Sequence, residues 1–287
     1  DLHSFPTRRS SDLHIAEVRG KFTWDNRRVN SAGHRFKLEL LGSSIVKSLG
    51  ARYVIPVMDV ALEKLEFTAN IVEEEIGDTE SQRAEVGSGL TQAIGRWQRV
   101  LFVRLSNETT TEGDGTSNTA FYVFPGISYS TLPSYIVGGK ARPYRLYFEL
   151  RGSPTTLGSD ASFVQFRFQG ERIFNFAERW HLDLRAELGT TRLDSDRPAA
   201  EEILDLPASQ RFFAGGDRSV RGFSLNELAP RDENGDSIGG KHVATGTIEV
   251  VRELPRNFGV AAFYDIGNAF DDFKDPQFEY SLGLGVR

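Results

Sequence analysis

From residue 14 onward, apolar and polar residues alternate along the chain with a period of two. Between residues 182 and 188, apolar side chains alternate with Asp183, Arg185 and Glu187. Three further segments alternate in the same way: 35–40, 144–151 and 164–169. Successive side chains of a β-strand point to opposite faces, so each segment is predicted to be a strand with one apolar and one polar face.

This periodicity, read together with the turn signals, predicts an all-β chain. Short joints are predicted at 30–33, 95–96, 178–179 and 255–257, most of them marked by Gly, Asn or Pro, and longer polar loops are predicted at 78–81, 108–118, 154–160 and 194–241. Thirteen strands are expected between them: 15–29, 34–44, 47–58, 62–77, 81–94, 97–109, 118–133, 143–155, 160–176, 180–193, 242–254, 258–270 and 277–287.

Two architectures share this pattern. A soluble β-sandwich turns the apolar faces inward and has strands of about 5–6 residues, whereas a membrane barrel turns them toward lipid and has strands of about ten. The polar faces here are rich in charge and the segments are long, which favours a transmembrane antiparallel barrel. Alternating short joints and long loops are also typical of the two ends of such a barrel.

Composition narrows the function classes. The chain of 287 residues contains no Cys, which excludes disulfides, thiolate metal sites and Cys nucleophiles. Its formal net charge of -6 argues against a nucleic-acid partner. No apolar run approaches the ~18 residues that a spanning helix needs.

Both ends of the sequence suggest a fragment. Residues 1–13 resemble a translated sequencing adapter and are expected to be an artefact, which leaves 14–287 as the folded part. Single-chain bacterial barrels normally have an even number of strands, and the last predicted strand stops in mid-pattern. We therefore expect about 13 strands of 16, with the first strand, the last strands and any N-terminal domains missing.

The loop 194–241 carries the most specific motif. It contains the run Arg-Phe-Phe-Ala-Gly-Gly-Asp-Arg-Ser-Val-Arg-Gly-Phe at residues 211–223. This run resembles the signature of the outer-membrane assembly barrels of the bacterial surface antigen superfamily, which includes BamA, TamA and the two-partner secretion transporters. Residues 263–268, Phe-Tyr-Asp-Ile-Gly-Asn, resemble the Asp-x-Gly strand motif of the same superfamily. The fuller stretch 211–223 looks most like the TamA branch.

The resemblance implies that the long loop folds into the barrel lumen and that its Arg is held by acidic groups of the wall. Strand parity agrees, because Asp265 falls on the face opposite Val260 and Tyr264. We predict a direct Arg221–Asp265 pair, with Glu249 and Glu279 as second-rank acceptors. The expected site residues are Gly215, Gly216, Asp217, Arg218, Val220, Arg221, Gly222 and Phe223 in the loop, and Asp265 and Gly267 in the wall.

The resemblance also implies a function: assembly and insertion of outer-membrane proteins, including autotransporters, in the bacterial outer membrane. The mechanism would be lateral opening of the barrel seam and templating of an incoming strand at the exposed edge. Implied partners are outer-membrane lipids, unfolded barrel or autotransporter clients, periplasmic POTRA domains and, for TamA, the periplasm-spanning TamB. About 18 residues separate Phe223 from Lys241, a compact connection that favours TamA over BamA.

Alternative functions stay open on the sequence alone. BamA or a two-partner secretion transporter is the nearest alternative, followed by a passive porin and a soluble β-sandwich binding module. No enzyme, metal site or cofactor is expected, because the His residues are scattered and the acidic run 232–236 lacks the glycine position and distal Glu of a calcium loop. That run is expected to be a solvated turn.

Overall fold

The computed structural model describes residues 19–57, 62–132, 144–195, 202–255 and 258–286, so the suspected adapter 1–13 lies outside the described residues. These residues form one antiparallel sheet of 13 strands in which every strand pairs with its neighbours in sequence. The predicted strand number and all-β class are confirmed. The strands are β1 (Gly20–Asn26), β2 (Arg35–Gly42), β3 (Val46–Pro56), β4 (Glu63–Ile76), β5 (Thr79–Ile94), β6 (Trp97–Thr111), β7 (Ser117–Thr131), β8 (Tyr144–Ser153), β9 (Ser162–Ala177), β10 (Trp180–Asp194), β11 (His242–Leu254), β12 (Phe258–Phe270) and β13 (Glu279–Val286).

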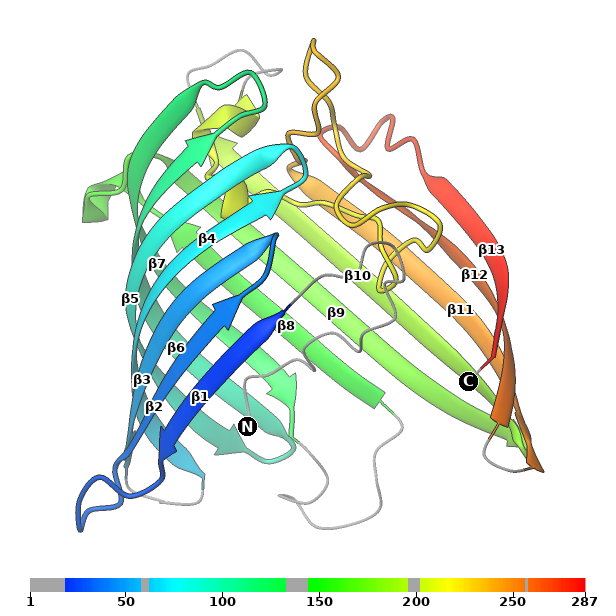
Figure 1. Ribbon diagram of the computed structural model, residues 1–287, viewed down its shortest axis with the longest axis horizontal. Helices are drawn as coiled ribbons and strands as arrows, with labels where there is room; N and C mark the ends of the chain where they lie inside the picture. The colour runs from blue at the N-terminus through cyan, green and yellow to red at the C-terminus, as the bar shows by residue number, and fades with distance from the viewer. Residues whose placement is uncertain (1–18, 58–61, 133–143, 196–201, 256–257, 287) are drawn as a thin grey trace.

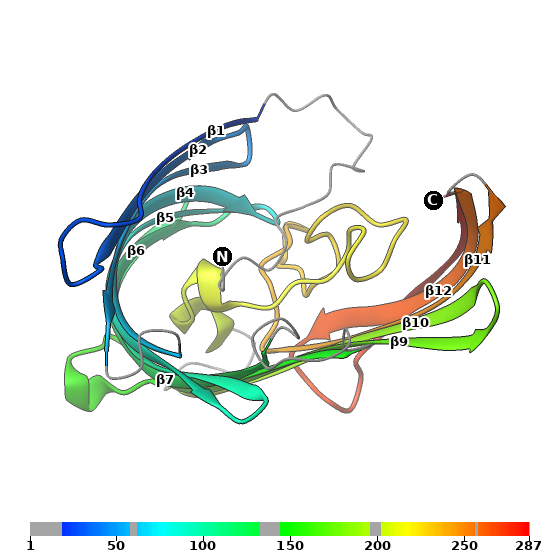
Figure 2. The ribbon, with the colours of Figure 1, turned by 90° about the horizontal axis from the view of Figure 1, so that it is seen from below.

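The sheet is strongly curved, with β1 and β13 as its two edges. Figure 1 shows the tilted strands side by side, and Figure 2 shows the sheet curling around the segment between β10 and β11. We call residues 202–241 the inner loop. It carries two short 3₁₀ helices, η2 (Glu202–Asp205) and η3 (Ala208–Gln210); a third, η1 (Thr155–Leu157), follows β8. No helix among the described residues is long and apolar enough to cross a membrane.

Alternation along each strand separates a convex apolar face from a concave polar one. In β12, Val260, Tyr264 and Ile266 are exposed while Asp265 is fully buried. Large exposed apolar side chains occur along most of the sheet, such as Ile71 at 61% and Ile248 at 52% exposure. Exposed apolar side chains on the convex face match a surface solvated by lipid.

The packed core lies between the inner loop and the concave face. In one cluster, Ile203 and Leu206 of the loop pack on Tyr122 and Phe124 of β7 and on Phe163 of β9. A second cluster joins the loop to β11 and β12, and it contains Phe212, Ala214, Val220, Leu228, Val243 and Ala269. The concave face is therefore polar only in part, because it turns aromatic where the loop covers it.

Two of the predicted long loops are shorter in the structure. At the first, Gly77 and Asp78 alone separate β4 from β5, and β5 begins at Thr79. At the second, β6 and β7 extend to Thr111 and from Ser117, so that only 112–116 remain as a turn. The strands continue with polar residues on both faces, which removes the two-residue period although the pairing of Thr111 with Ser117 persists. The expected contrast in loop length between the two ends is correspondingly weaker.

Candidate functional site

The structure places Arg221 against Asp265. Arg221 donates from Nε to Asp265 Oδ2 at 2.7 Å and from Nη2 to Oδ1 at 2.8 Å, and its backbone N–H donates to Oδ2 at 3.1 Å. Its Nη1 donates to Glu249 Oε2 at 2.6 Å. One guanidinium thus binds one carboxylate through two parallel bonds and a second carboxylate at its other end, a geometry that only Arg provides. We call these three residues the Arg221 anchor.

Strand register explains why the two acids converge. Glu249 in β11 lies opposite Phe263 in β12, and Thr247 lies opposite Asp265. Both carboxylates therefore project from the concave face, two residues apart along the paired strands. The side chain of Asp265 is 0% exposed and that of Glu249 is 1% exposed. The Arg221 guanidinium carbon lies 3.4 Å from the Phe263 ring centroid, which adds a cation–π contact on its open side.

The electrostatics of the anchor favour a permanently charged Arg221. Burial alone would lower the pKa of Arg221, but its hydrogen bonds to Asp265 and Glu249 raise that pKa above its ordinary value. Arg185 Nη2 lies 3.8 Å from Glu249 Oε2 and supplies a second positive charge. Both arginines place positive charge beside buried carboxylates, in a setting where an uncompensated charge would be costly.

The other predicted loop residues hold the anchor in place. Val220 is fully buried in the second core cluster, and Phe223 packs against that cluster. Gly216 donates its backbone N–H to the Phe223 carbonyl at 3.0 Å, which closes the motif on itself. Gly215 donates to Ser219 Oγ at 2.8 Å. Asp217 and Arg218 lie exposed at the intervening turn.

The other two residues predicted in the wall are Gly267 and Glu279. They lie opposite each other across β12 and β13. Glu279 is exposed, and within the described part of the chain it forms no ion pair or hydrogen bond with Arg221. Of the two second-rank acceptors, the structure brings only Glu249 to the guanidinium.

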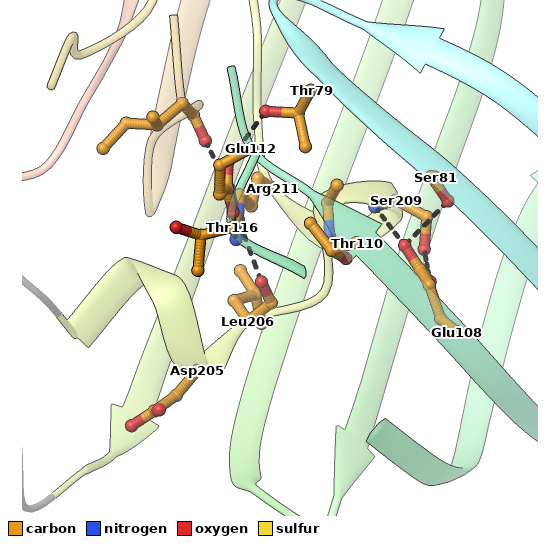
Figure 3. A network of polar contacts seen from close by, with 12 residues as sticks. Thr79, Ser81, Glu108, Thr110, Glu112, Thr116, Asp205, Leu206, Ser209 and Arg211 are labelled. Atoms are coloured by element: carbon orange, nitrogen blue, oxygen red, sulfur yellow. Dashed lines mark hydrogen bonds and ion pairs between the residues drawn. The ribbon is translucent and has the colours of Figure 1, made fainter. Parts of the chain in front are cut away.

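A second site, which the sequence analysis missed, joins the inner loop to the other side of the sheet (Figure 3). Arg211 is 1% exposed and donates from Nη2 to Glu112 Oε1 at 2.7 Å and from Nη1 to Oε2 at 3.2 Å. Its remaining donors reach the Leu206 carbonyl at 2.9 Å and the Ile238 carbonyl at 3.0 Å. Thr79 Oγ1 donates to Glu112 Oε2 at 3.0 Å. We call Arg211, Glu112 and Thr79 the Arg211 anchor.

A neighbouring carboxylate strengthens this attachment. Glu108 of β6 accepts from the Ser209 backbone N–H at 3.0 Å and from Ser209 Oγ at 2.6 Å. Ser81 of β5 donates to the same carboxylate at 2.9 Å. Glu108 is 1% exposed, so these donors replace the water that the carboxylate loses on burial.

The motif leaves no room for a side chain at Gly215. Its φ is +101°, and a Cβ atom there would lie 2.4 Å from the Ser224 carbonyl oxygen. We expect Gly215→Ala to loosen the inner loop and to speed tryptic cleavage within it. Gly235→Ala is the matched control, because Gly235 has φ +91° but nothing within 4 Å of its added Cβ. Equal cleavage rates in the two variants would show that left-handed backbone alone, rather than close packing at Gly215, limits the loop.

The chemistry available to these two anchors is charge pairing and hydrogen bonding. Among the described residues, no group of three or more His, Cys, Asp or Glu side chains is arranged to hold a metal ion. The acidic run after residue 231 forms a turn in which Asp232 accepts the backbone N–H groups of Asn234 and Asp236, both at 2.9 Å.

The chain is similar in sequence to known proteins. Residues 32–287 match the model of the Omp85 superfamily domain. Outer membrane protein assembly factor BamA of Nitratidesulfovibrio vulgaris is 28% identical over 183 residues, which cover 61% of this chain and 22% of that protein. Sorting and assembly machinery component 50 homolog B of Xenopus laevis is 32% identical over 111 residues, which cover 38% of this chain and 22% of that protein.

The fold has a counterpart among solved structures. The crystal structure of BamA from Haemophilus ducreyi lacking POTRA domains 1–3 superposes with a TM-score of 0.76 at 12% sequence identity, covering 94% of this chain and 60% of that one. At that identity the likeness concerns the fold alone. The chain spans 22% of the length of the two curated relatives described above.

Proposed function

The chain belongs to the Omp85 superfamily, and from this membership we propose that the protein is an outer-membrane protein assembly and insertion factor. Membership also confirms the predicted location in the bacterial outer membrane. The observation that carries the proposal is the Arg221 anchor, in which the inner loop is held to the wall by one Arg and two buried carboxylates. A loop fixed in this way lies across the concave side, which we assign to the barrel lumen.

In this proposal no covalent reaction is involved. The seam of the complete barrel opens laterally, and its exposed strand edge pairs with an incoming strand of the client, which is β-augmentation within a membrane. The inner loop keeps the wall in shape while the seam opens. Lipids contact the convex apolar face, and unfolded barrel or autotransporter chains are the clients.

Within the superfamily we propose a TamA-like role with a TamB-like partner, on the strength of the compact connection between Phe223 and Lys241. The similarity to BamA of N. vulgaris supports BamA as the second candidate. The gene upstream distinguishes these roles: three POTRA domains are expected for TamA, five for BamA and two for a two-partner secretion transporter.

Assembly activity is tested by reconstituting the full-length protein in lipid vesicles with an unfolded β-barrel client. We expect the client to become protease-resistant faster than in empty vesicles, and Arg221→Ala to remove most of that acceleration. Arg231→Ala is the control, because this Arg is exposed and its guanidinium donates to carbonyls of its own loop, those of Gly235 and Glu227. Client folding at the empty-vesicle rate, combined with large steady ion conductance, would indicate a porin instead.

A further inference from the structure

The two anchors of the inner loop lie on opposite parts of the curved sheet. Arg211 binds Glu112, which directly follows β6, whereas Arg221 binds Glu249 of β11 and Asp265 of β12. The strands β7 to β10 separate these two parts along the sheet. In Figure 2 the loop crosses the concavity from the β5–β6 side toward the β11–β12 side.

Further contacts hold each end of this crossing. On the first side, Ser209 binds Glu108 of β6, and the Ser237 backbone N–H donates to Asp78 in the β4–β5 turn at 2.7 Å. On the second side, the Lys241 backbone N–H donates to Asp271, just beyond β12, at 2.9 Å. The loop is therefore attached to both sides by side chains of the wall, and Glu108 is the buried acceptor among these additional contacts.

We propose that Arg211 is a positioning residue. Together with Arg221, it makes the inner loop a connection across the concave side that fixes the separation between β5–β6 and β11–β12. Because both anchors belong to one short stretch of chain, each holds the other near its partner and raises its effective concentration. Displacement of one side of the sheet therefore weakens the anchor contacts on the other side, and this coupling works in both directions.

The burial and the contacts of Arg211 favour a role in connecting the two sides of the sheet over a role confined to the inner loop. The Arg211 side chain is 1% exposed, and its guanidinium joins Glu112 of the wall to two carbonyls of the inner loop, those of Leu206 and Ile238. An Arg that only solubilised the loop would be exposed, as Arg231 is. Phe212, the next residue, packs in the core cluster that contains Val220, so the peptide between the anchors is itself packed.

The chain lacks Cys, so spin labels can be placed at engineered cysteines without background. Val103 in β6 and Ile248 in β11 are exposed on the convex face, at 45% and 52%, and report the distance across the sheet. Ile71 in β4, 61% exposed, paired with Val103 reports distance within one side. Pulsed electron paramagnetic resonance on the full-length protein in nanodiscs gives both distance distributions.

We expect Arg211→Ala to broaden the Val103–Ile248 distribution by at least twofold and to leave the Ile71–Val103 distribution unchanged. Arg211→Lys should give an intermediate width, because an ammonium keeps the charge but cannot bind both carboxylate oxygens in parallel. Arg211→Ala combined with Arg221→Ala should broaden the cross-sheet distance less than the two single variants added together, because the loss of either anchor already releases the connection across the sheet. Arg231→Ala, in an exposed part of the same loop, should change neither distance.

Heat-dependent gel migration shows whether each variant is folded, and Glu112→Gln provides a milder change should Arg211→Ala fail to fold. Unchanged cross-sheet widths in a folded Arg211→Ala or Glu112→Gln protein would overturn the proposal. Equal broadening of both label pairs would also overturn it, because that pattern indicates general loss of packing. The readout is a distance, so the result is independent of whether the protein assembles clients.

Discussion

Arg221→Ala is expected to lower the free energy of unfolding by about 3–5 kcal/mol, because it leaves buried carboxylates without the cation that pairs with them. Asp265 and Glu249 are 0% and 1% exposed, and both lose a direct hydrogen bond in the variant. Arg185 remains only at 3.8 Å from Glu249, too far to replace the lost donors. Urea titration of the protein in detergent micelles or lipid vesicles, followed by heat-dependent gel migration, measures the loss.

The mechanism predicts partial rescue by removal of a second charge. Arg221→Ala with Glu249→Gln should be more stable than Arg221→Ala alone, because one buried negative charge is gone and the Gln can still hydrogen-bond. Arg231→Ala should change stability by no more than about 0.5 kcal/mol, as is usual for an exposed residue. If Arg221→Ala is as stable as Arg231→Ala, the two carboxylates are not held by Arg221 and the anchor has no energetic role.

The second large effect is expected at Gly267, where β12 has no room for a side chain. A Cβ atom there would lie 2.6 Å from the Ala244 carbonyl oxygen and 2.7 Å from Thr245 Cα, both backbone atoms of the paired strand β11. Because Thr245 is the register partner of Gly267, Gly267→Ala must push the two strands apart two residues from Asp265. We expect a loss of about 3 kcal/mol, typical of overpacking that the backbone cannot relieve.

The same strand pair offers a matched control. Gly246 of β11 pairs with Ile266, and an added Cβ would lie 3.8 Å from Ile266 Cγ2, an ordinary contact. Gly246→Ala should therefore fold with nearly native stability. Similar urea midpoints for the two variants would contradict the close approach at Gly267, whereas a selective loss in Gly267→Ala would locate it.

Much of this architecture could be predicted because the two-residue period is read directly from the sequence. From β2 onward, each strand begins and ends within two residues of its predicted bounds. Parity alone put Asp265 on the concave face opposite Tyr264, and the structure joins that Asp to Arg221. This prediction depended on strand parity, because Val260, Tyr264 and Ile266 share the face opposite Asp265.

The Arg211 anchor could not be predicted for a related reason. Residues 108–118 carry polar side chains on both faces and predict a loop between the strands expected at 97–109 and 118–133, so Glu108 lies at the end of a predicted strand and Glu112 has no predicted direction. In the structure Glu108 lies within β6 and points into the concave side, because ladder pairing with β7 fixes its parity. Arg211 was visible in the motif, but its acidic partner lies 99 residues earlier in the chain, and no local pattern links the two.

The same sequence separations set an order for folding. The Arg221 contacts close over 44 residues to Asp265 and 28 to Glu249, whereas Arg211 reaches Glu112 over 99 residues and Ser209 reaches Glu108 over 101. The entropic difference from loop length is modest, about 0.6 kcal/mol per doubling, but the longer contacts also require β7 to β10 to be paired and curved first. The loop is thus expected to dock on the β11–β12 hairpin early, and its attachment to β5–β6 becomes one of the last steps by which the barrel acquires its final shape.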